Sequence, residues 1–223
     1  MIDKRVDNLE AALFGIEDGA TILVGGFGNA GSPIQLLEAL IDQGATDLTI
    51  VANNAGEGEF GLAALMKAGR VSKVICSYPR SSGSIIFEEL YEKGEINLEV
   101  VPQGTLSERM RAAGAGIGGF FTPTSAGTLL GANKETREIN GRLHVLETPL
   151  KGDVALIKGD LGDRWGNLTY NKSARNFGPT MAMAADLTIA QVKTITELGN
   201  ISPESVITPG IFVDRVIELR EEL

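Results

Sequence analysis

Short apolar runs alternate along the first half of the chain with segments whose apolar positions recur at helical spacing. The runs predict buried parallel strands, because both faces of such strands are covered and few polar residues interrupt them. These strands are expected at 22–24, 48–51, 71–77 and 96–101. The helical spacing predicts helices at 7–17, 33–43, 60–68 and 85–93. Strands that alternate with helices of this length indicate right-handed βαβ crossovers and a parallel sheet.

The pattern changes in the second half of the chain. A capping box at 105–108 predicts a helix that breaks at the glycine-rich stretch 114–119. Alternation on both sides of Asn140-Gly141 predicts an antiparallel hairpin over 136–146 with a type I′ turn. Further elements are expected as strands at 154–158 and 187–192, a helix at 175–185, and a short charged C-terminal helix after 209–214. The expected fold is α/β: a largely parallel sheet flanked by helices, with an antiparallel hairpin extension, in a single domain over residues 1–223.

Length and charge narrow the classes of function. A chain of 223 residues can bury the core of one α/β domain, and 43% hydrophobic residues exclude a disordered chain. The net charge of -9, with no basic run, argues against partners such as nucleic acid or an anionic membrane. The N-terminal segment lacks the apolar core of a signal peptide, and no apolar stretch is long enough to span a bilayer. A cytoplasmic location is therefore expected.

The chain has one cysteine and one histidine, which limits its chemistry. Cys76 lies in an apolar run, so it is expected to be a buried small side chain without a disulfide partner. His144 has no second histidine with which to hold a metal, so no metal site is expected. No G-x-S-x-G elbow is present, and the acidic pair Glu57 and Glu59 is typical of a solvated loop. The residues indicate no nucleophile of the chain's own.

A glycine-rich turn, Gly25-Gly26-Phe27-Gly28-Asn29-Ala30-Gly31, follows the first predicted strand. Ser32 is expected to cap the next helix, Pro33 to take its first position and Gln35 to complete a capping box. A turn between a strand and a helix N-terminus presents bare amides and a positive helix end. This geometry predicts a site for phosphate or another anion.

The same turn has two other interpretations. Residues 26–31 match G-x-G-x-x-G, which predicts dinucleotide binding where an acidic residue ends the second strand. Here the second strand runs into Asn53 and Asn54, which carry no charge to hold a ribose. The other interpretation is a tight turn that merely needs small residues.

Three loops with glycine or amide residues follow predicted strands, at 25–31, 53–58 and 102–119. Ligands of parallel sheets bind beyond the carboxyl ends of the strands, where these loops would converge. The sequence therefore predicts a site for an anionic, phosphate-bearing ligand at that edge of the sheet.

Segments across nearly the whole chain resemble the first (alpha) subunit of the family I CoA-transferases. They occur in order as D-G at 18–19, the apolar triplet 22–24, G-G-F at 25–27, Gly31 and Pro33, N-N-A-G at 53–56, P-Q-G-T-L at 102–106, G-A-G-I at 114–117, F-T-P-T at 121–124, G-N-L-T-Y at 166–170, A-R-N-F at 174–177 and T-P-G at 208–210. Within the family, 163–167 and 188–192 are most similar to alpha subunits that act on 3-oxoadipate. Those that act on acetoacetate often carry Glu where Gln191 stands.

The resemblance implies a ping-pong transfer of CoA from succinyl-CoA to a 3-oxoacid, expected to be 3-oxoadipate. The nucleophilic glutamate is expected on a partner, the second (beta) subunit, and passes through an acyl anhydride to a glutamyl-CoA thioester. CoA is then a substrate, and no permanently bound cofactor is expected. In this chain Gln103 matches the family's oxyanion-hole side chain, which is the expected catalytic residue. The residues expected to bind CoA are Gly25, Gly26, Phe27, Gly28, Asn29, Ala30, Gly31, Asn53 and Asn54.

Other functions stay open at this point. The alpha subunit of an acetoacetate or acetate CoA-transferase would carry most of the same segments. A dinucleotide-binding module, a sugar-phosphate isomerase or a transcriptional sensor would share the α/β pattern, although a sensor normally adds a basic DNA-binding segment. Gln103 could also be a capping or loop-bonding amide rather than an oxyanion donor.

Overall fold

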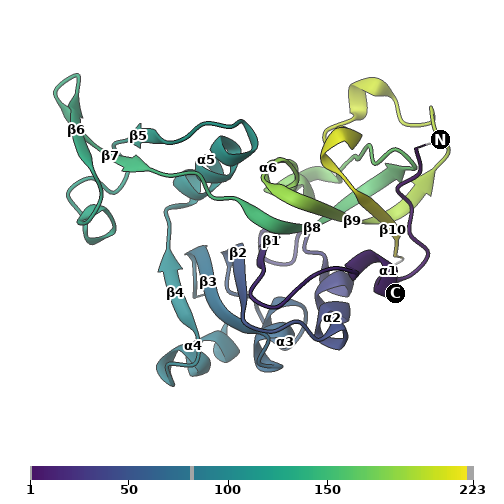
Figure 1. The fold of residues 1–223 in the computed structure, drawn as a ribbon, viewed down its shortest axis with the longest axis horizontal. Coiled ribbons are helices and arrows are strands. Elements are labelled where there is room, and N and C mark those ends of the chain that lie inside the picture. The colour runs from purple at the N-terminus through teal and green to yellow at the C-terminus, as the bar shows by residue number, and fades with distance from the viewer. Residues whose placement is uncertain (1, 81–82, 220–223) are drawn as a thin grey trace.

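A seven-stranded sheet forms the centre of the computed structural model, which describes residues 2–80 and 83–219 (Figure 1). All its strand pairs are parallel, and the strand order is β10-β9-β8-β1-β2-β3-β4. The strands are β1 (Thr21–Val24), β2 (Leu48–Asn54), β3 (Val71–Tyr78), β4 (Asn97–Val100), β8 (Gly152–Asp163), β9 (Ala185–Thr196) and β10 (Arg215–Glu218). The parallel sheet expected from the alternating pattern is confirmed.

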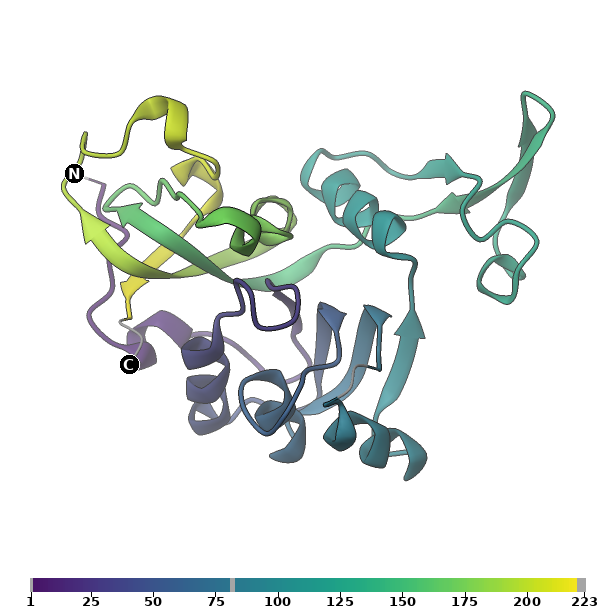
Figure 2. The same ribbon diagram turned by 180° about the vertical axis from the view of Figure 1, so that it is seen from behind.

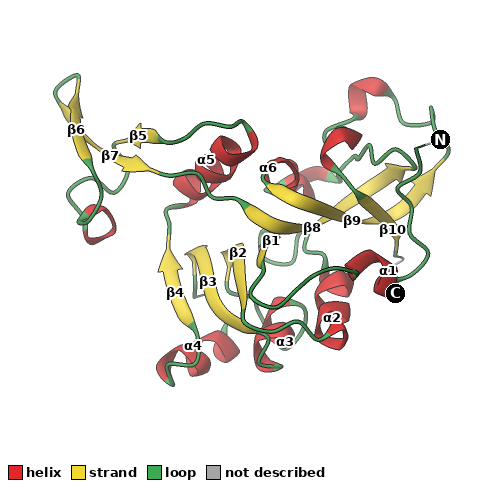
Figure 3. Ribbon diagram, viewed as in Figure 1, coloured by secondary structure: helices red, strands yellow, loops and turns green. Residues whose placement is uncertain are grey.

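Helices cover both faces of this sheet (Figure 3). One face carries α1 (Leu9–Leu13), α2 (Ile34–Gln43), α3 (Leu62–Lys67) and α4 (Ile85–Glu92), and the other carries α5 (Gln103–Gly114) and α6 (Gly178–Met183). Side chains of β1 alternate between the two cores: Ile22 packs into the first, and Leu23 into the second. Because both sides of the strand are buried, its sequence is a continuous apolar run. No helix among the described residues has the length and apolar character needed to cross a membrane.

A small antiparallel sheet projects from the body of the molecule (Figure 2). Its strands are β5 (Phe120–Thr122), β6 (Thr136–Ile139) and β7 (Arg142–Glu147), in the order β5-β7-β6. Asn140 and Gly141 have φ of 51° and 73°, the left-handed geometry of a type I′ turn. The expected hairpin extension is confirmed, and β5 adds a third strand to it.

The C-terminal elements differ most from the sequence predictions. β8 and β9 have twelve residues each, longer than expected, and pair with each other over most of their length. Glycines at 152, 159 and 162 weaken the strand pattern of β8, yet they allow neighbouring side chains to approach its backbone. Residues 215–218 form β10 rather than the start of a helix, because they pair with β9. Leu219 follows β10 without regular secondary structure, and residues 220–223 of that expected helix lie outside the described part of the chain, as do residues 81–82.

Several helix boundaries also differ from those expected. The helix expected over 7–17 is limited to α1, and that expected over 175–185 to α6, with a 3₁₀ turn at Lys172–Arg175 before it. Both capping-box predictions are wrong. α2 follows Pro33 with no side-chain cap, and the Gln35 side chain instead accepts a hydrogen bond from Gln191. α5 starts at Gln103, two residues before Thr105, because the Leu106 amide already bonds to the Pro102 carbonyl. The end of α2 at Gly44 is confirmed, with φ of 99°.

Candidate active site

Four segments meet at the carboxyl edge of the sheet. β1 leads into the glycine-rich turn, β2 ends at Asn54, β3 ends at Tyr78, and α5 begins at Gln103 just after β4. Parallel pairing sets Asn54 beside Tyr78, so both strands end at one level. Together these segments line an open cleft of about 430 Å³, whose lining residues are Phe27, Gly28, Asn53, Asn54, Glu57, Ser77, Tyr78 and Gln103. The structure thus places five of the ten expected site residues around one cleft.

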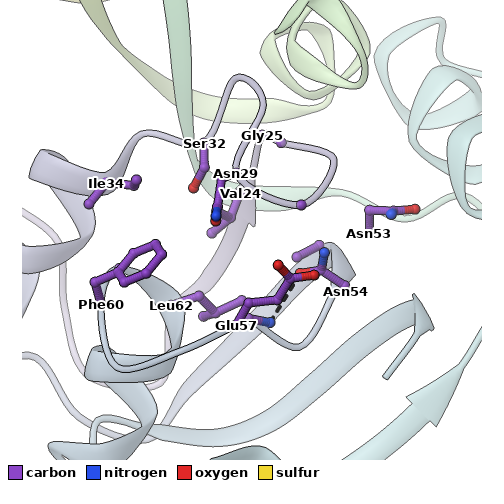
Figure 4. Close-up of a pocket in the computed structure, with 15 residues that line it drawn as sticks. Val24, Gly25, Asn29, Ser32, Ile34, Asn53, Asn54, Glu57, Phe60 and Leu62 are labelled. Atoms are coloured by element: carbon purple, nitrogen blue, oxygen red, sulfur yellow. Dashed lines mark hydrogen bonds between the residues drawn. The ribbon is translucent and has the colours of Figure 1, made fainter. Parts of the chain in front are cut away.

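A narrow pocket adjoins this cleft under the glycine-rich turn (Figure 4). Gly25, Gly26 and Asn29 line it from the turn, and Glu57 and Phe60 from the loop after β2. Asn53 lies apart from the other labelled side chains in this view, on the side of the open cleft. The pocket and the cleft share Gly28, Asn53, Asn54 and Glu57, so they form one connected site.

The glycine-rich turn is closed by hydrogen bonds within the protein. Phe27 and Ala30 exchange two backbone hydrogen bonds, of 3.0 and 3.2 Å. The Gly26 amide donates to Asn176 Oδ1 at 3.0 Å, and the Gly25 amide donates to a carbonyl of β8 at 3.0 Å. The prediction of a cradle of bare amides is therefore wrong at these positions, because their N–H groups already have protein acceptors.

The end of the turn faces away from the cleft. Ala30 and Gly31 line a separate cavity of about 700 Å³ that contains Lys158, Lys172 and Lys193. A Cβ on Gly31 would clash with the Ala174 carbonyl oxygen, so packing requires glycine there. Unlike the other residues expected to bind CoA, Ala30 and Gly31 line neither the cleft nor the adjoining pocket.

Gln103 is held by a side-chain hydrogen bond across the cleft floor. Its Nε2 donates to Asn53 Oδ1 at 2.7 Å, and the Ser77 hydroxyl donates to the same oxygen at 2.8 Å. The Nε2 group has two hydrogens, so one remains to donate to a ligand. Asn54 has a local role instead: its Oδ1 accepts from the Gly56 amide at 3.0 Å and forms an Asx turn.

An ionic cluster ties the middle of α5 to β3 and β4. Arg109 of α5 contacts Glu99 of β4 at 3.2 Å and donates to the Thr148 carbonyl at 2.8 Å, while Lys73 of β3 contacts Glu99 at 2.7 Å. Burial opposes the charge of Glu99, but the hydrogen bonds from Lys73 and Arg109 outweigh it and lower the pKa of that carboxyl.

Among the described residues, the side chains near the cleft include no activated nucleophile. Cys76 is fully buried, and burial raises the pKa of its thiol to about 12, which leaves it a neutral thiol. Glu57 is the one carboxylate among the residues that line the cleft. Glu147 is buried in the small sheet and pairs with Lys134. Across residues 2–80 and 83–219, no three His, Cys, Asp or Glu side chains are placed together to hold a metal ion.

Sequence reasoning missed three residues of the site. Ser77 and Tyr78 end β3, and their position after an apolar run was a signal that could have found them. Asn176 acts on the turn from 150 residues away, and no local pattern indicates that contact. Two aromatic rings at the cleft, Phe27 and Tyr78, are 55% and 60% exposed. They offer apolar surface beside the polar floor.

Comparison with known proteins gives consistent matches over nearly the full length of the chain. A family model described as Coenzyme A transferase matches residues 6–219. The chain is 63% identical over 217 residues to the first (alpha) subunit of the 3-oxoadipate CoA-transferase of Pseudomonas putida, covering 97% of this chain and 94% of that protein. It is 49% identical over 215 residues to the corresponding subunit of the succinyl-CoA:3-ketoacid coenzyme A transferase of Xanthomonas campestris pv. campestris (strain B100), covering 96% and 88%.

Solved structures share the fold. An acyl-CoA transferase from E. coli O157:H7, determined as a thioester complex with CoA, superimposes with a TM-score of 0.85 at 22% identity. The match covers 98% of this chain and 47% of that one, so this chain spans about half of the longer protein.

Proposed function

The chain belongs to the coenzyme A transferase family, and we propose that it is the alpha subunit of a two-chain enzyme that moves CoA from succinyl-CoA to 3-oxoadipate. The observation that carries this proposal is 63% identity, over almost the full length of both chains, to a subunit named for that acceptor. The cleft supports it, because its lining residues supply an amide donor and backbone turns but no activated nucleophile to complete the chemistry alone.

The nucleophile is a glutamate of the beta subunit. Its carboxylate attacks the thioester carbonyl of succinyl-CoA, and the CoA thiolate leaves to give an acyl-glutamyl anhydride. The thiolate then attacks the glutamyl carbonyl, which releases succinate and leaves a glutamyl-CoA thioester. A carboxylate of 3-oxoadipate then attacks the carbonyl of the glutamyl-CoA thioester, which gives a second anhydride and releases the CoA thiolate. The thiolate attacks the 3-oxoadipyl carbonyl of this anhydride, which forms 3-oxoadipyl-CoA and frees the glutamate.

Each of these acyl transfers passes through a tetrahedral oxyanion, and Gln103 is its donor in this chain. One Nε2 hydrogen is engaged by Asn53, and the other is left for the oxyanion. A side-chain amide does not titrate, so this donor is present across the working pH range. The open cleft between Gln103 and Gly28 is the place where the thioester end of CoA binds.

A second candidate acceptor is acetoacetate, favoured by the 49% identity to a subunit that is named for 3-ketoacids. The test is to assemble the chain with its candidate beta subunit and to measure transfer from succinyl-CoA to each acceptor. A kcat/KM for 3-oxoadipate at least tenfold above that for acetoacetate supports the proposal. The reverse ratio assigns acetoacetate, and no transfer to either acid contradicts both.

A further inference from the structure

Ser77 lines the cleft beside Gln103, and the proposed reaction gives this side chain no role. It stands one residue before the end of β3, next to β2. The pairs Ala52 with Cys76 and Asn54 with Tyr78 flank it, so strand register sets Ser77 beside Asn53. The position of its hydroxyl is therefore fixed by the sheet rather than by a loop.

The Ser77 hydroxyl holds Asn53 at two points. Its oxygen lies 2.8 Å from Asn53 Oδ1 and 3.0 Å from the Asn53 carbonyl oxygen, so one proton is shared between two acceptors of one residue. Asn53 is 5% exposed, and in this buried setting the hydrogen bond restrains rotation of its side chain. An amide oxygen has two lone pairs, which leaves one to accept the 2.7 Å hydrogen bond from Gln103 Nε2.

We propose that Ser77 is a positioning residue that acts through Asn53 to aim the Gln103 amide at the developing oxyanion. This inference rests on the proposed function, in which Gln103 is the oxyanion donor. Asn53 then serves to orient Gln103, a role different from the CoA contact expected from the sequence.

The physical reason is the freedom of a glutamine side chain. Gln103 stands at the first position of α5 and is reached by solvent, so its rotatable bonds would sample several orientations without a fixed acceptor. An oxyanion donor is effective when it is already aimed before charge develops. Because Ser77 fixes Asn53 and Asn53 fixes one Nε2 hydrogen, the other hydrogen is directed into the cleft before substrate binds.

The test uses the assembled two-chain enzyme and a matched control on the same strand. Ser72 also lies in β3 and contacts a carbonyl of β2, at 3.5 Å from Leu48, but it does not touch Asn53. We expect Ser77→Ala to lower kcat about threefold to tenfold, the worth of one hydrogen bond, with little change in the KM for succinyl-CoA. Ser77→Thr keeps the hydroxyl and should recover most of the loss. Ser72→Ala should leave kcat unchanged.

The decisive measurement repeats Ser77→Ala in a Gln103→Ala background. If Ser77 acts through Gln103, the second substitution adds no further loss of kcat. An equal loss in both backgrounds, or a change in KM alone, would overturn the inference. A hundredfold lower kcat in the Gln103→Ala enzyme together with an unchanged kcat in the Ser77→Ala enzyme would also overturn it.

A structural measurement separates this inference from the proposed function. In a crystal structure of the Ser77→Ala enzyme, the inference expects the Gln103 amide to move from Asn53 or to occupy more than one orientation. An unmoved Gln103 overturns the inference even where CoA transfer is confirmed. The two results can also differ. If Gln103 is displaced in the Ser77→Ala enzyme but the Gln103→Ala enzyme keeps full kcat, the contact is confirmed and the proposed donor role of Gln103 is rejected.

Discussion

The side chain of Asn176 joins the two halves of the glycine-rich turn: its Oδ1 accepts from the Gly26 amide at 3.0 Å, and its Nδ2 donates to the Ala30 carbonyl at 2.8 Å. Gly26 lies near the start of the turn and Ala30 near its end. One amide side chain from the segment before α6 therefore fixes the turn that lines the cleft.

Replacing Asn176 should loosen this turn. Asn176→Ala leaves the Gly26 amide and the Ala30 carbonyl without these partners, at a cost of about 1–3 kcal/mol. For a chain of this size that corresponds to a fall in Tm of roughly 2–12 °C, and we expect a higher KM for succinyl-CoA in the assembled enzyme. Asn176→Asp keeps the acceptor for Gly26 but not the donor for Ala30, so its defect should be intermediate in Tm. A wild-type Tm and KM for Asn176→Ala would show that the turn does not depend on this side chain.

Gly28 gives a second test of the turn. Its φ is 56°, and no atom lies within 4 Å of the position a Cβ would take, so Gly28→Val adds backbone strain and fills cleft space without a clash. We expect the variant to fold and assemble but to lose most of its kcat/KM. Gly94→Val is the control, because Gly94 has a similar φ of 73° and equally open surroundings but does not line the cleft. Wild-type kcat/KM for Gly28→Val would mean that the turn is structural only.

Much of the fold could be predicted because it depends on local sequence. Buried strands such as β1 are continuous apolar runs, and Asn140-Gly141 permits the left-handed turn of the hairpin. β10 could not be predicted, because the strand at 215–218 depends on pairing with β9. The caps at Ser32 and Thr105 failed for a related reason: a capping pattern competes with backbone bonds and distant side chains, and here those interactions prevail.

The sequence could predict which loops form the candidate site, but not which side chains contact one another there. Parallel strands end at one edge, so the convergence of Gly28, Asn53 and Gln103 follows from topology. The orientation of each side chain does not. Asn53 faces Gln103 because of the hydroxyl of Ser77, 24 residues further along the chain, and Gly26 is bonded to Asn176, 150 residues away. Such contacts are set by register and packing, which a single sequence does not encode locally.

The chain alone should not transfer CoA. Among the residues that line the cleft, Glu57 is the one carboxylate, and Cys76 of β3 is buried as a neutral thiol. We expect no transfer from succinyl-CoA to 3-oxoadipate by the purified chain, and restoration on adding the beta subunit. Glu57→Gln in the assembled enzyme serves as the control and should keep the glutamyl-CoA intermediate, which borohydride reduction and mass spectrometry can locate. Turnover by the single chain that is abolished by Glu57→Gln would instead identify Glu57 as the nucleophile.

Stability should fall at alkaline pH. Burial raises the pKa of Cys76 from 9.0 to about 12 and that of Tyr170 from 10.0 to about 12. The folded chain thus keeps protons that the unfolded chain releases. The stabilisation is complete below pH 9 and is lost as pH rises toward 12, by up to about 1.4 kcal/mol per pH unit for each group. Urea unfolding at several pH values between 8 and 11 measures this slope.

Two substitutions show which group causes the fall in stability with pH. Tyr170→Phe should reduce it above pH 10, and Cys76→Ala should reduce it from pH 9 upward, whatever each does to the stability at pH 8. Unchanged slopes in both variants would show that neither group stays protonated in the folded chain.

Gln103 gives the most direct test of the proposed chemistry. The charge on the substrate oxygen is larger in the tetrahedral intermediate than in the thioester, so a hydrogen bond from Gln103 Nε2 should act on kcat more than on KM. Removing one oxyanion donor typically costs about a hundredfold to a thousandfold in kcat. We expect a loss of that order for Gln103→Ala in the assembled enzyme. Gln103→Glu should be at least as poor, because a carboxylate offers no donor and repels the oxyanion.

The alternative role for Gln103 is structural, because its Nε2 donates a hydrogen bond to Asn53 without any substrate present. Thermal stability and assembly with the beta subunit are therefore measured on the same Gln103→Ala protein. A kcat within about threefold of wild type, which is only ~0.7 kcal/mol, would remove Gln103 from the mechanism. A large fall in Tm with a normal kcat per folded enzyme would make it a loop-bonding amide. A hundredfold loss of kcat at unchanged Tm fits the oxyanion donor, because a structural role would lower Tm and a ground-state contact would raise KM.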